Sequence, residues 1–261
     1  MQFAGQSYRG ASFFEFLSAD HADLVPDFRN VDWSQVEVPH GTTVLSVVYE
    51  DGVLMAGDRL ATEGYQVATR DIDKVYKVDG NCVIAIAGAA GPAIEMVHMF
   101  RLELEHYEKL EGQGLAFEGK ANRLSFLLRQ NLPAAMQGLV VMPMFAGYDL
   151  EKSKGRIYKF DITGGRYAEM DYYATGSGGK DARSSLKKSF RHSGFARNAV
   201  IEAAVEALVD AADEDRGTGG FDTNRGIYPT CMLATRAGIE EVSEKEMLQA
   251  YERVTERMRA A

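Results

Sequence analysis

The sequence has few of the residues on which small secreted proteins and membrane proteins depend. Only two of its 261 residues are cysteines, Cys82 and Cys231, and neither lies in a CxxC pair or a Cys/His cluster. Because zinc sites and disulfide frameworks need such spacings, we expect two buried, reduced thiols, no metal and a reducing compartment. No segment approaches the ~18 uninterrupted apolar residues of a membrane-spanning helix. The N-terminal region also lacks the basic segment of a secretory signal, so we expect a cytoplasmic protein without a membrane partner.

Positive charge is scarce as well. Lysine and arginine number 29 against 38 aspartates and glutamates, which gives a formal net charge of -9. Since binding to phosphate backbones needs a basic face, nucleic acid is excluded as the main partner. Gly176–Lys180 resembles a phosphate-binding loop, but Ala174 stands where the first glycine belongs and Asp181 follows the lysine. We therefore expect neither a nucleotide nor another cofactor.

The chain has enough apolar residues, 46%, for one large core. Residues 1–41 show no sustained hydrophobic period and are predicted to be a poorly structured leader. From Thr42 onward, strands are expected at residues 42–49, 53–57, 74–78, 82–87, 140–148, 156–160, 167–174 and 228–235. Helices are expected at residues 92–110, 117–137, 177–190, 198–212 and 243–259. Grouped strands followed by helix pairs predict an α+β fold in which two packed sheets are covered by helices.

The first two hairpins bring four polar or small residues toward one place. In a hairpin, residues equidistant from the turn face each other, so the first hairpin returns Asp58 beside Thr42. The second hairpin has Lys74 and Gly88 at its open end. If the two hairpins lie side by side in one sheet, these four residues cluster at its edge.

That cluster has a chemical meaning if Thr42 is an N-terminus. A free α-amino group has a pKa of about 7.7–8.0, so it serves as a general base near neutral pH for the hydroxyl of the same residue. The Lys74 ammonium would lower the pKa of that amine, and Asp58 would hold Lys74 by ion pairing. The N–H of Gly88 would approach a developing oxyanion, because no side chain blocks it.

Gly41 has two interpretations. It is either an ordinary turn glycine before a threonine-rich strand, or the last residue of a leader that is cut off. In the second case the Thr42 hydroxyl attacks the carbonyl carbon of Gly41, and a residue without Cβ leaves the approach open. The ordered set of Asp58, Lys74 and Gly88 behind Thr42 favours the second interpretation.

The sequence resembles the β-subunits of the 20S proteasome, specifically those of actinobacterial type. The matching stretches are GTTVLSVVYEDGVLMAGDR, RDIDKVYKV, IAGAAG, ELEHYEKLEG, NLPAAMQG, AGYD, TGSGG, AADEDRGTGG and RGIYPT. The resemblance implies an N-terminal-nucleophile hydrolase fold, which is a four-layer αββα sandwich of two antiparallel sheets. It also implies a propeptide, residues 1–41, that is removed autocatalytically, and a catalytic domain, residues 42–261.

The resemblance further implies the roles of individual residues in a threonine endopeptidase. The implied catalytic set is Thr42, Asp58, Lys74, Gly88, Ser177, Asp215 and Thr218. Ser177 matches the serine that bonds the threonine amine, and Asp215 begins the D-x-x-S-G pattern, in which Thr218 replaces the usual serine. Asp222 is a rival for the aspartate. The residues implied around the substrate are Thr62, which would contact its backbone, and the apolar S1 set Ala61, Ile72, Tyr76, Ile86 and Ala90, which predicts cleavage after apolar or aromatic residues.

The implied partners are proteasome α-subunits, other β-subunits in stacked heptameric rings, an ATP-dependent unfoldase regulator, and unfolded polypeptides as substrates. Two alternatives remain. The first is a different N-terminal-nucleophile hydrolase, such as a small-molecule amidase or a bacterial threonine protease with hexameric rings. The long leader and the terminal helix count against that protease. A non-catalytic ring subunit would have lost the threonine or its supporting residues, and this chain keeps them.

Overall fold

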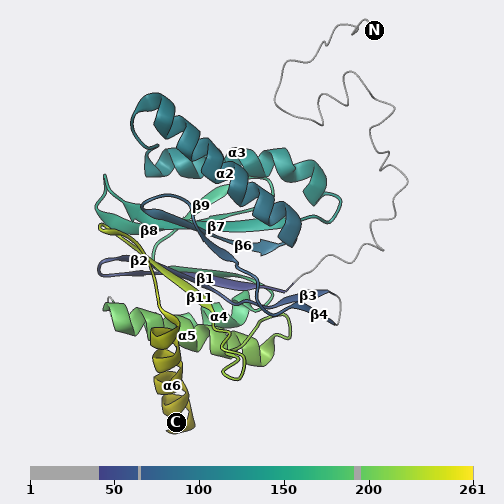
Figure 1. Cartoon of the computed structure of the whole chain (residues 1–261), viewed down its shortest axis with the longest axis vertical. Coiled ribbons are helices and arrows are strands. Elements are labelled where there is room, and N and C mark those ends of the chain that lie inside the picture. Colours follow the sequence, from purple (N-terminus) through teal and green to yellow (C-terminus); the bar gives the residue numbers. More distant parts are fainter. Residues whose placement is uncertain (1–40, 64–65, 191–194, 261) are drawn as a thin grey trace, which may run out of the picture. The chain divides into compact units, whose positions relative to one another are not determined.

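The computed structural model describes residues 41–63, 66–190 and 195–260, which all belong to one unit of the chain, Glu37–Ala261. The predicted leader lies outside the described residues, except for Gly41. Two five-stranded antiparallel sheets are stacked on each other, with helices on both outer faces (Figure 1). The predicted α+β class and four-layer sandwich are thereby confirmed.

The first sheet contains the start of the described chain. Its strands are, in spatial order, β10 (Tyr172–Gly176), β1 (Thr43–Tyr49), β2 (Gly52–Gly57), β11 (Thr230–Thr235) and β12 (Gly238–Glu241). The predicted hairpin of β1 and β2 is present, and its register pairs Val44 with Gly57. One residue further along, Asp58 lies opposite Thr43, and its N–H donates to the Thr43 carbonyl over 3.1 Å. The hairpin thus fixes Asp58 beside the first residues of β1.

The second sheet lies between the first sheet and a helix pair. Its strands are, in spatial order, β5 (Val75–Lys77), β6 (Cys82–Gly88), β7 (Val141–Asp149), β8 (Lys154–Phe160) and β9 (Arg166–Glu169). A separate two-stranded hairpin, β3 (Ala61–Glu63) with β4 (Gln66–Thr69), joins the two sheets in sequence. Cys82 and Cys231 are buried and unpaired in β6 and β11, as predicted.

The arrangement of the two predicted hairpins differs from the conditional expectation that they lie side by side. The first, β1–β2, lies in one sheet and the second, β5–β6, in the other. They cannot pair edge to edge, because both edges of the first hairpin are occupied: β1 pairs with β10 and β2 with β11. Instead they pack face to face through apolar side chains that include Val44, Met55, Val75, Val83 and Ala85. The open ends of the hairpins still meet, but across the sandwich.

One predicted strand is wrong. Residues 167–174 form two strands, β9 and β10, that belong to different sheets. The chain turns at Met170 and Asp171, and this turn carries it from one sheet to the other. The β-branched and aromatic composition on both sides of the turn gave no indication of the break.

Helices cover both sheets. They are α2 (Ala90–Glu111), α3 (Phe117–Ala135), α4 (Gly179–Ser189), α5 (Arg197–Glu214) and α6 (Glu244–Ala260). The first two pack on the second sheet, and α4 and α5 pack on the first, with α6 against α5. Pro133 lies within the last turn of α3, two residues before the helix ends. A capping box begins α6, since the Ser243 N–H donates to the Glu246 carboxylate and the Glu246 N–H donates to the Ser243 hydroxyl, each over 3.3 Å.

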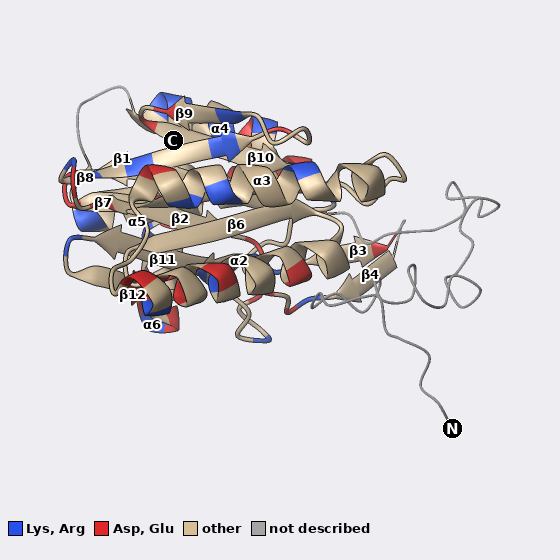
Figure 2. Cartoon of the chain, turned by 90° about the horizontal axis from the view of Figure 1, so that it is seen from above, with Lys and Arg blue, Asp and Glu red and all other residues tan. Residues whose placement is uncertain are grey.

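Charged side chains lie on the outer helices and are absent from the buried strand β6. Both signs of charge lie on α2, α3 and α6, whereas the buried strand β6 carries none (Figure 2). No helix in the described ranges is both long enough and apolar enough to cross a membrane.

Candidate active site

A buried ion pair stands where the two sheets meet at the β1 end. Asp58 follows β2 and is fully buried, and Lys74 precedes β5 and is 5% exposed. The Lys74 ammonium donates to Asp58 Oδ1 over 2.8 Å. It also donates to the Leu60 carbonyl over 2.5 Å and to the Gly41 carbonyl over 2.8 Å, so all three of its hydrogens have acceptors. Burial lowers the pKa of Lys74, and the charge of Asp58 opposes this shift only in part.

Backbone donors complete the shell of the Asp58 carboxylate. Oδ1 accepts the N–H of Thr43 over 2.7 Å, and Oδ2 accepts those of Leu60 over 3.0 Å and Gly219 over 2.8 Å. A buried carboxylate with four donors is satisfied and cannot rotate freely. Leu60 and Gly219 were not singled out from the sequence, because a backbone contribution leaves no signal in side-chain type.

Thr42 lies beside this pair with its peptide bond to Gly41 intact. The Thr42 hydroxyl donates to the Gly41 carbonyl over 2.6 Å, and Lys74 donates to the same oxygen. Gly41 has φ +154, and a Cβ on it would lie 2.5 Å from Thr62 Oγ1 and 2.7 Å from the Gly217 carbonyl. Only glycine fits this position without displacing its neighbours.

Gly88 ends β6 next to the same residues. Its φ is +117, and a Cβ would lie 2.1 Å from the Val140 carbonyl, so this position also requires glycine. The N–H of Ile86 donates to the Lys74 carbonyl over 3.0 Å. Because N–H groups two residues apart point to the same side of a strand, the Gly88 N–H points to the side on which Lys74 lies.

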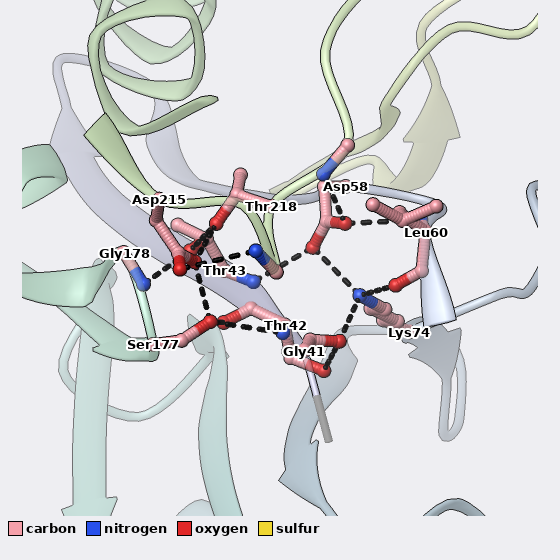
Figure 3. Close-up of polar contacts among 12 residues, drawn as sticks. Gly41, Thr42, Thr43, Asp58, Leu60, Lys74, Ser177, Gly178, Asp215 and Thr218 are labelled. Atoms are coloured by element: carbon pink, nitrogen blue, oxygen red, sulfur yellow. Dashed lines mark hydrogen bonds and ion pairs between the residues drawn. The ribbon is translucent and has the colours of Figure 1, made fainter. Parts of the chain in front are cut away.

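A second polar cluster lies on the other side of Thr42. The carboxylate of Asp215, which follows α5, accepts the Ser177 hydroxyl, the Thr218 hydroxyl over 2.6 Å and the Gly217 N–H over 3.1 Å (Figure 3). Burial alone would raise the pKa of Asp215, but these hydrogen bonds and the Lys74 charge outweigh it, so the pKa lies below its ordinary value. The Thr42 N–H donates to Ser177 Oγ over 3.3 Å.

The structure places the rival aspartate elsewhere. Asp222 pairs with Arg225 through an ion pair of 2.6 Å, and its pKa is lowered chiefly by that bond. Asp215 is thus the aspartate that contacts Ser177 and Thr218.

A small cavity opens beside Thr42 and Gly88. Its lining contains all five residues of the implied S1 set, namely Ala61, Ile72, Tyr76, Ile86 and Ala90. Thr62 lies next to Gly41, on β3. Within the described ranges, no group of three or more histidine, cysteine or carboxylate side chains is arranged to hold a metal ion.

Comparisons with known proteins decide the family. A family model described as proteasome subunit matches residues 38–223. The chain belongs to the proteasome subunit family. The segments that carry the two polar clusters, from Thr42 to Asp222, all lie within the matched range.

The similar proteins are β-type proteasome subunits of actinobacteria. "Proteasome subunit beta" of Acidimicrobium ferrooxidans is 50% identical over 238 residues, which cover 91% of this chain and 86% of that protein. The Streptomyces griseus protein of that name is 46% identical over 249 residues, covering 95% and 88%. The Acidothermus cellulolyticus protein is 47% identical over 249 residues, covering 93% and 86%. The chain is therefore a β-type subunit of the 20S proteasome, a protease that it forms by assembling with other proteasome subunits.

Proposed function

We propose that this β subunit is catalytic and of the threonine type, with the Thr42 hydroxyl as nucleophile and the Thr42 α-amine as general base. The observation that carries the proposal is the position of the Thr42 hydroxyl and the Lys74 ammonium, which both donate to the carbonyl oxygen of Gly41. A hydroxyl at its own preceding peptide bond, with a cation on the carbonyl oxygen, is arranged for self-cleavage.

Self-cleavage releases the base that the later reaction needs. The Thr42 Oγ attacks the Gly41 carbonyl carbon, and Lys74 stabilises the developing negative charge on the oxygen. The proton that leaves Oγ passes to the Thr42 nitrogen as the C–N bond breaks, so that the acyl group moves from nitrogen to Oγ. Water then hydrolyses the resulting ester to the Gly41 carboxylate and the free Thr42 hydroxyl. The products are a leader that ends at Gly41 and a chain that begins with the free amine of Thr42. Residues 1–41 are thus a propeptide in this proposal.

Peptide hydrolysis repeats these steps on a substrate. The Thr42 amine takes the hydroxyl proton while Oγ attacks the scissile carbonyl, and it returns the proton to the leaving amine. The Gly88 N–H donates to the oxyanion. Asp58 keeps Lys74 protonated at the site, and Ser177 with Asp215 orients the amine. Water, activated by the same amine, then hydrolyses the acyl ester. The S1 residues in the lining of the cavity carry no charge, which favours an apolar or aromatic residue before the scissile bond.

The assembly belongs to the same proposal. We place the chain in stacked heptameric β rings between rings of α-subunits, in the cytoplasm, with an ATP-dependent unfoldase that supplies unfolded polypeptides. The remaining alternative is a non-catalytic ring subunit. The satisfied Asp58–Lys74 pair beside Thr42 favours a catalytic subunit, because a buried ion pair is costly to keep without a use.

The proposal is tested by co-expression with a proteasome α-subunit. We expect intact mass to show a wild-type chain that begins at Thr42. Thr42→Ala should keep residues 1–41 and lose peptidase activity, whereas Thr42→Ser, which keeps a hydroxyl, should still be processed. Active wild-type particles that retain the leader, or active Thr42→Ala particles, would overturn the proposal.

A further inference from the structure

Thr43 is fully buried and bonded to both polar clusters of the site. Its N–H donates to Asp58 Oδ1 over 2.7 Å. Its hydroxyl lies 2.6 Å from the Thr218 hydroxyl and accepts the Gly178 N–H over 3.0 Å. Figure 3 shows Thr43 between Asp58 on one side and Asp215 with Thr218 on the other. A threonine that only began a strand would need none of these side-chain bonds.

The direction of the bond between the two threonine hydroxyls follows from counting hydrogens. A hydroxyl has one hydrogen to donate, and an ionised carboxylate only accepts. Thr218 donates its hydrogen to Asp215 over 2.6 Å, and the lowered pKa of Asp215 keeps that carboxylate ionised. In the bond between Thr43 and Thr218, Thr43 is therefore the donor. The bonds run from the Gly178 N–H through Thr43 and Thr218 to Asp215.

A second series of hydrogen bonds runs from Thr42 to the same carboxylate, that of Asp215. The Ser177 hydroxyl lies within donating distance of Asp215 Oδ2 and, over 3.2 Å, of the Thr42 carbonyl. Its single hydrogen goes to the nearer, ionised carboxylate, so Ser177 Oγ is free to accept the Thr42 N–H. Thr218 also ends on Oδ2. Two adjacent threonines are thereby linked to one oxygen, Thr42 through Ser177 and Thr43 through Thr218. Hydrogen bonds in such chains polarise and strengthen one another.

The packing around Gly178 shows how closely the residues bonded to Thr43 fit together. A Cβ on Gly178 would lie 2.6 Å from Thr43 Oγ1 and 2.7 Å from Thr218 Oγ1. The Gly178 backbone, and with it the preceding Ser177, is thus held directly against the two hydroxyls.

We propose that Thr43 is a positioning residue for the reaction. Its hydroxyl fixes the Ser177–Gly178 backbone and, through Thr218, the Asp215 carboxylate. These groups in turn hold the nitrogen of Thr42 where it can take the proton of the Thr42 hydroxyl. This inference rests on the proposed role of Thr42. Removing the Thr43 hydroxyl leaves the Gly178 N–H without its acceptor and Thr218 without its donor, so Ser177 loses its fixed place.

The first experiment compares Thr43→Val with Thr43→Ser in assembled particles. Valine keeps the branched shape but not the hydroxyl, and serine keeps the hydroxyl. We expect Thr43→Val to slow leader removal and to lower kcat, per chain that begins at Thr42, by roughly 5- to 150-fold, as expected when a buried hydrogen-bond partner is lost. KM should stay within about twofold, because Thr43 does not line the cavity beside Thr42. Thr43→Ser should recover most of kcat.

A double-mutant cycle then distinguishes two causes of a lower kcat: the loss of the hydrogen bonds that link Thr43 to Thr218, and a general loss of stability. Thr218→Val breaks the same chain one bond later, so the double variant should lose little more kcat than either single variant. Ser46→Ala is the matched control, because it removes another buried hydroxyl of β1, one that donates only to the Leu54 carbonyl over 2.7 Å. We expect normal kcat for Ser46→Ala.

The inference is overturned if Thr43→Val keeps wild-type kcat and processing, if Thr43→Ser is as impaired as Thr43→Val, or if the two valine substitutions are additive. Thr42→Ala makes its failure distinguishable from failure of the proposed function. Active Thr42→Ala particles would refute the nucleophile, whereas inactive Thr42→Ala with unimpaired Thr43→Val would refute only the role of Thr43.

Discussion

Asp58 and Lys74 each bury a charge that the other compensates. The pair is held by three backbone N–H groups on the carboxylate and two backbone carbonyls on the ammonium. Removing one partner of such a pair costs about 3–5 kcal/mol, because the other charge stays buried. In the proposed mechanism the Lys74 ammonium stabilises negative charge on the carbonyl oxygen. Lys74 can do so only while it is protonated.

The pH profile tests this dependence. Since burial lowers the pKa of Lys74, its ammonium is lost at a lower pH than that of an exposed lysine, whose pKa is 10.5. We expect kcat/KM of assembled particles to fall on the alkaline side with an apparent pKa below 10.5. Circular dichroism at each pH controls for unfolding. An alkaline limb at or above 10.5 in folded particles would contradict the assignment.

At the scale of elements, one side chain connects α3 to the second sheet. Glu118, in the first turn of α3, accepts the Tyr158 hydroxyl and an Arg156 N–H over 2.7 Å each, and pairs with Arg166 over 2.8 Å. The hydrogen bond from Tyr158, followed by the arginines, lowers the pKa of Glu118 from 4.5 to about 2. This carboxylate also lies at a helix N-terminus, where negative charge is favourable.

We expect Glu118→Gln to lower Tm by roughly 2–4 °C, which corresponds to about 1 kcal/mol for a partly exposed ion pair in a domain of this size. Because the folded-state pKa is depressed, the stabilisation is fully present above pH 4.5 and is lost as the pH falls toward 2. The difference in Tm should therefore shrink over this range. Glu105→Gln, an exposed position on α2, is the control. A difference that persisted at pH 2 would refute the electrostatic explanation.

At the scale of the whole molecule, we expect assembly to cover apolar side chains that α2 exposes. Helix α2 presents Met99, Leu102 and Leu110, which are 44%, 59% and 70% exposed. Proteasome subunits assemble with one another, and contacts between subunits bury such residues.

We expect the double substitution Leu102→Asp and Leu110→Asp to reduce the yield of assembled particles several-fold, because it charges a surface that another subunit covers. Native mass spectrometry of the co-expressed subunits measures the yield, and circular dichroism of the unassembled chain verifies its fold. Glu105→Ala on the same helix should assemble normally. Full assembly of the double variant would show that this face of α2 stays open.

The local part of the site could be predicted from sequence because it depends on hairpin register. The pairing of Val44 with Gly57 puts Asp58 beside Thr43, and this follows from counting back from the turn. The face-to-face stacking of the two hairpins could not be predicted in this way. Strands β2 and β6 are buried on both faces, so their sequences lack the alternation that would show which face meets which layer.

The sequence by itself determined the leader boundary that we propose, the order of the helices and most of the strands, and the residues that we propose carry the chemistry. These depend on local period, on turns and on matching stretches. The hairpin β3–β4, the strand β12 and the division of residues 167–174 into two strands came only from the structure. Only the tertiary structure decided which atoms meet. Ser177 and Thr218 lie 135 and 175 residues from the threonines they contact, and no local pattern encodes contacts over such separations. Only the folded chain shows Thr43 as a link between Asp58 and Asp215, because the bonds that define its role all come from other elements.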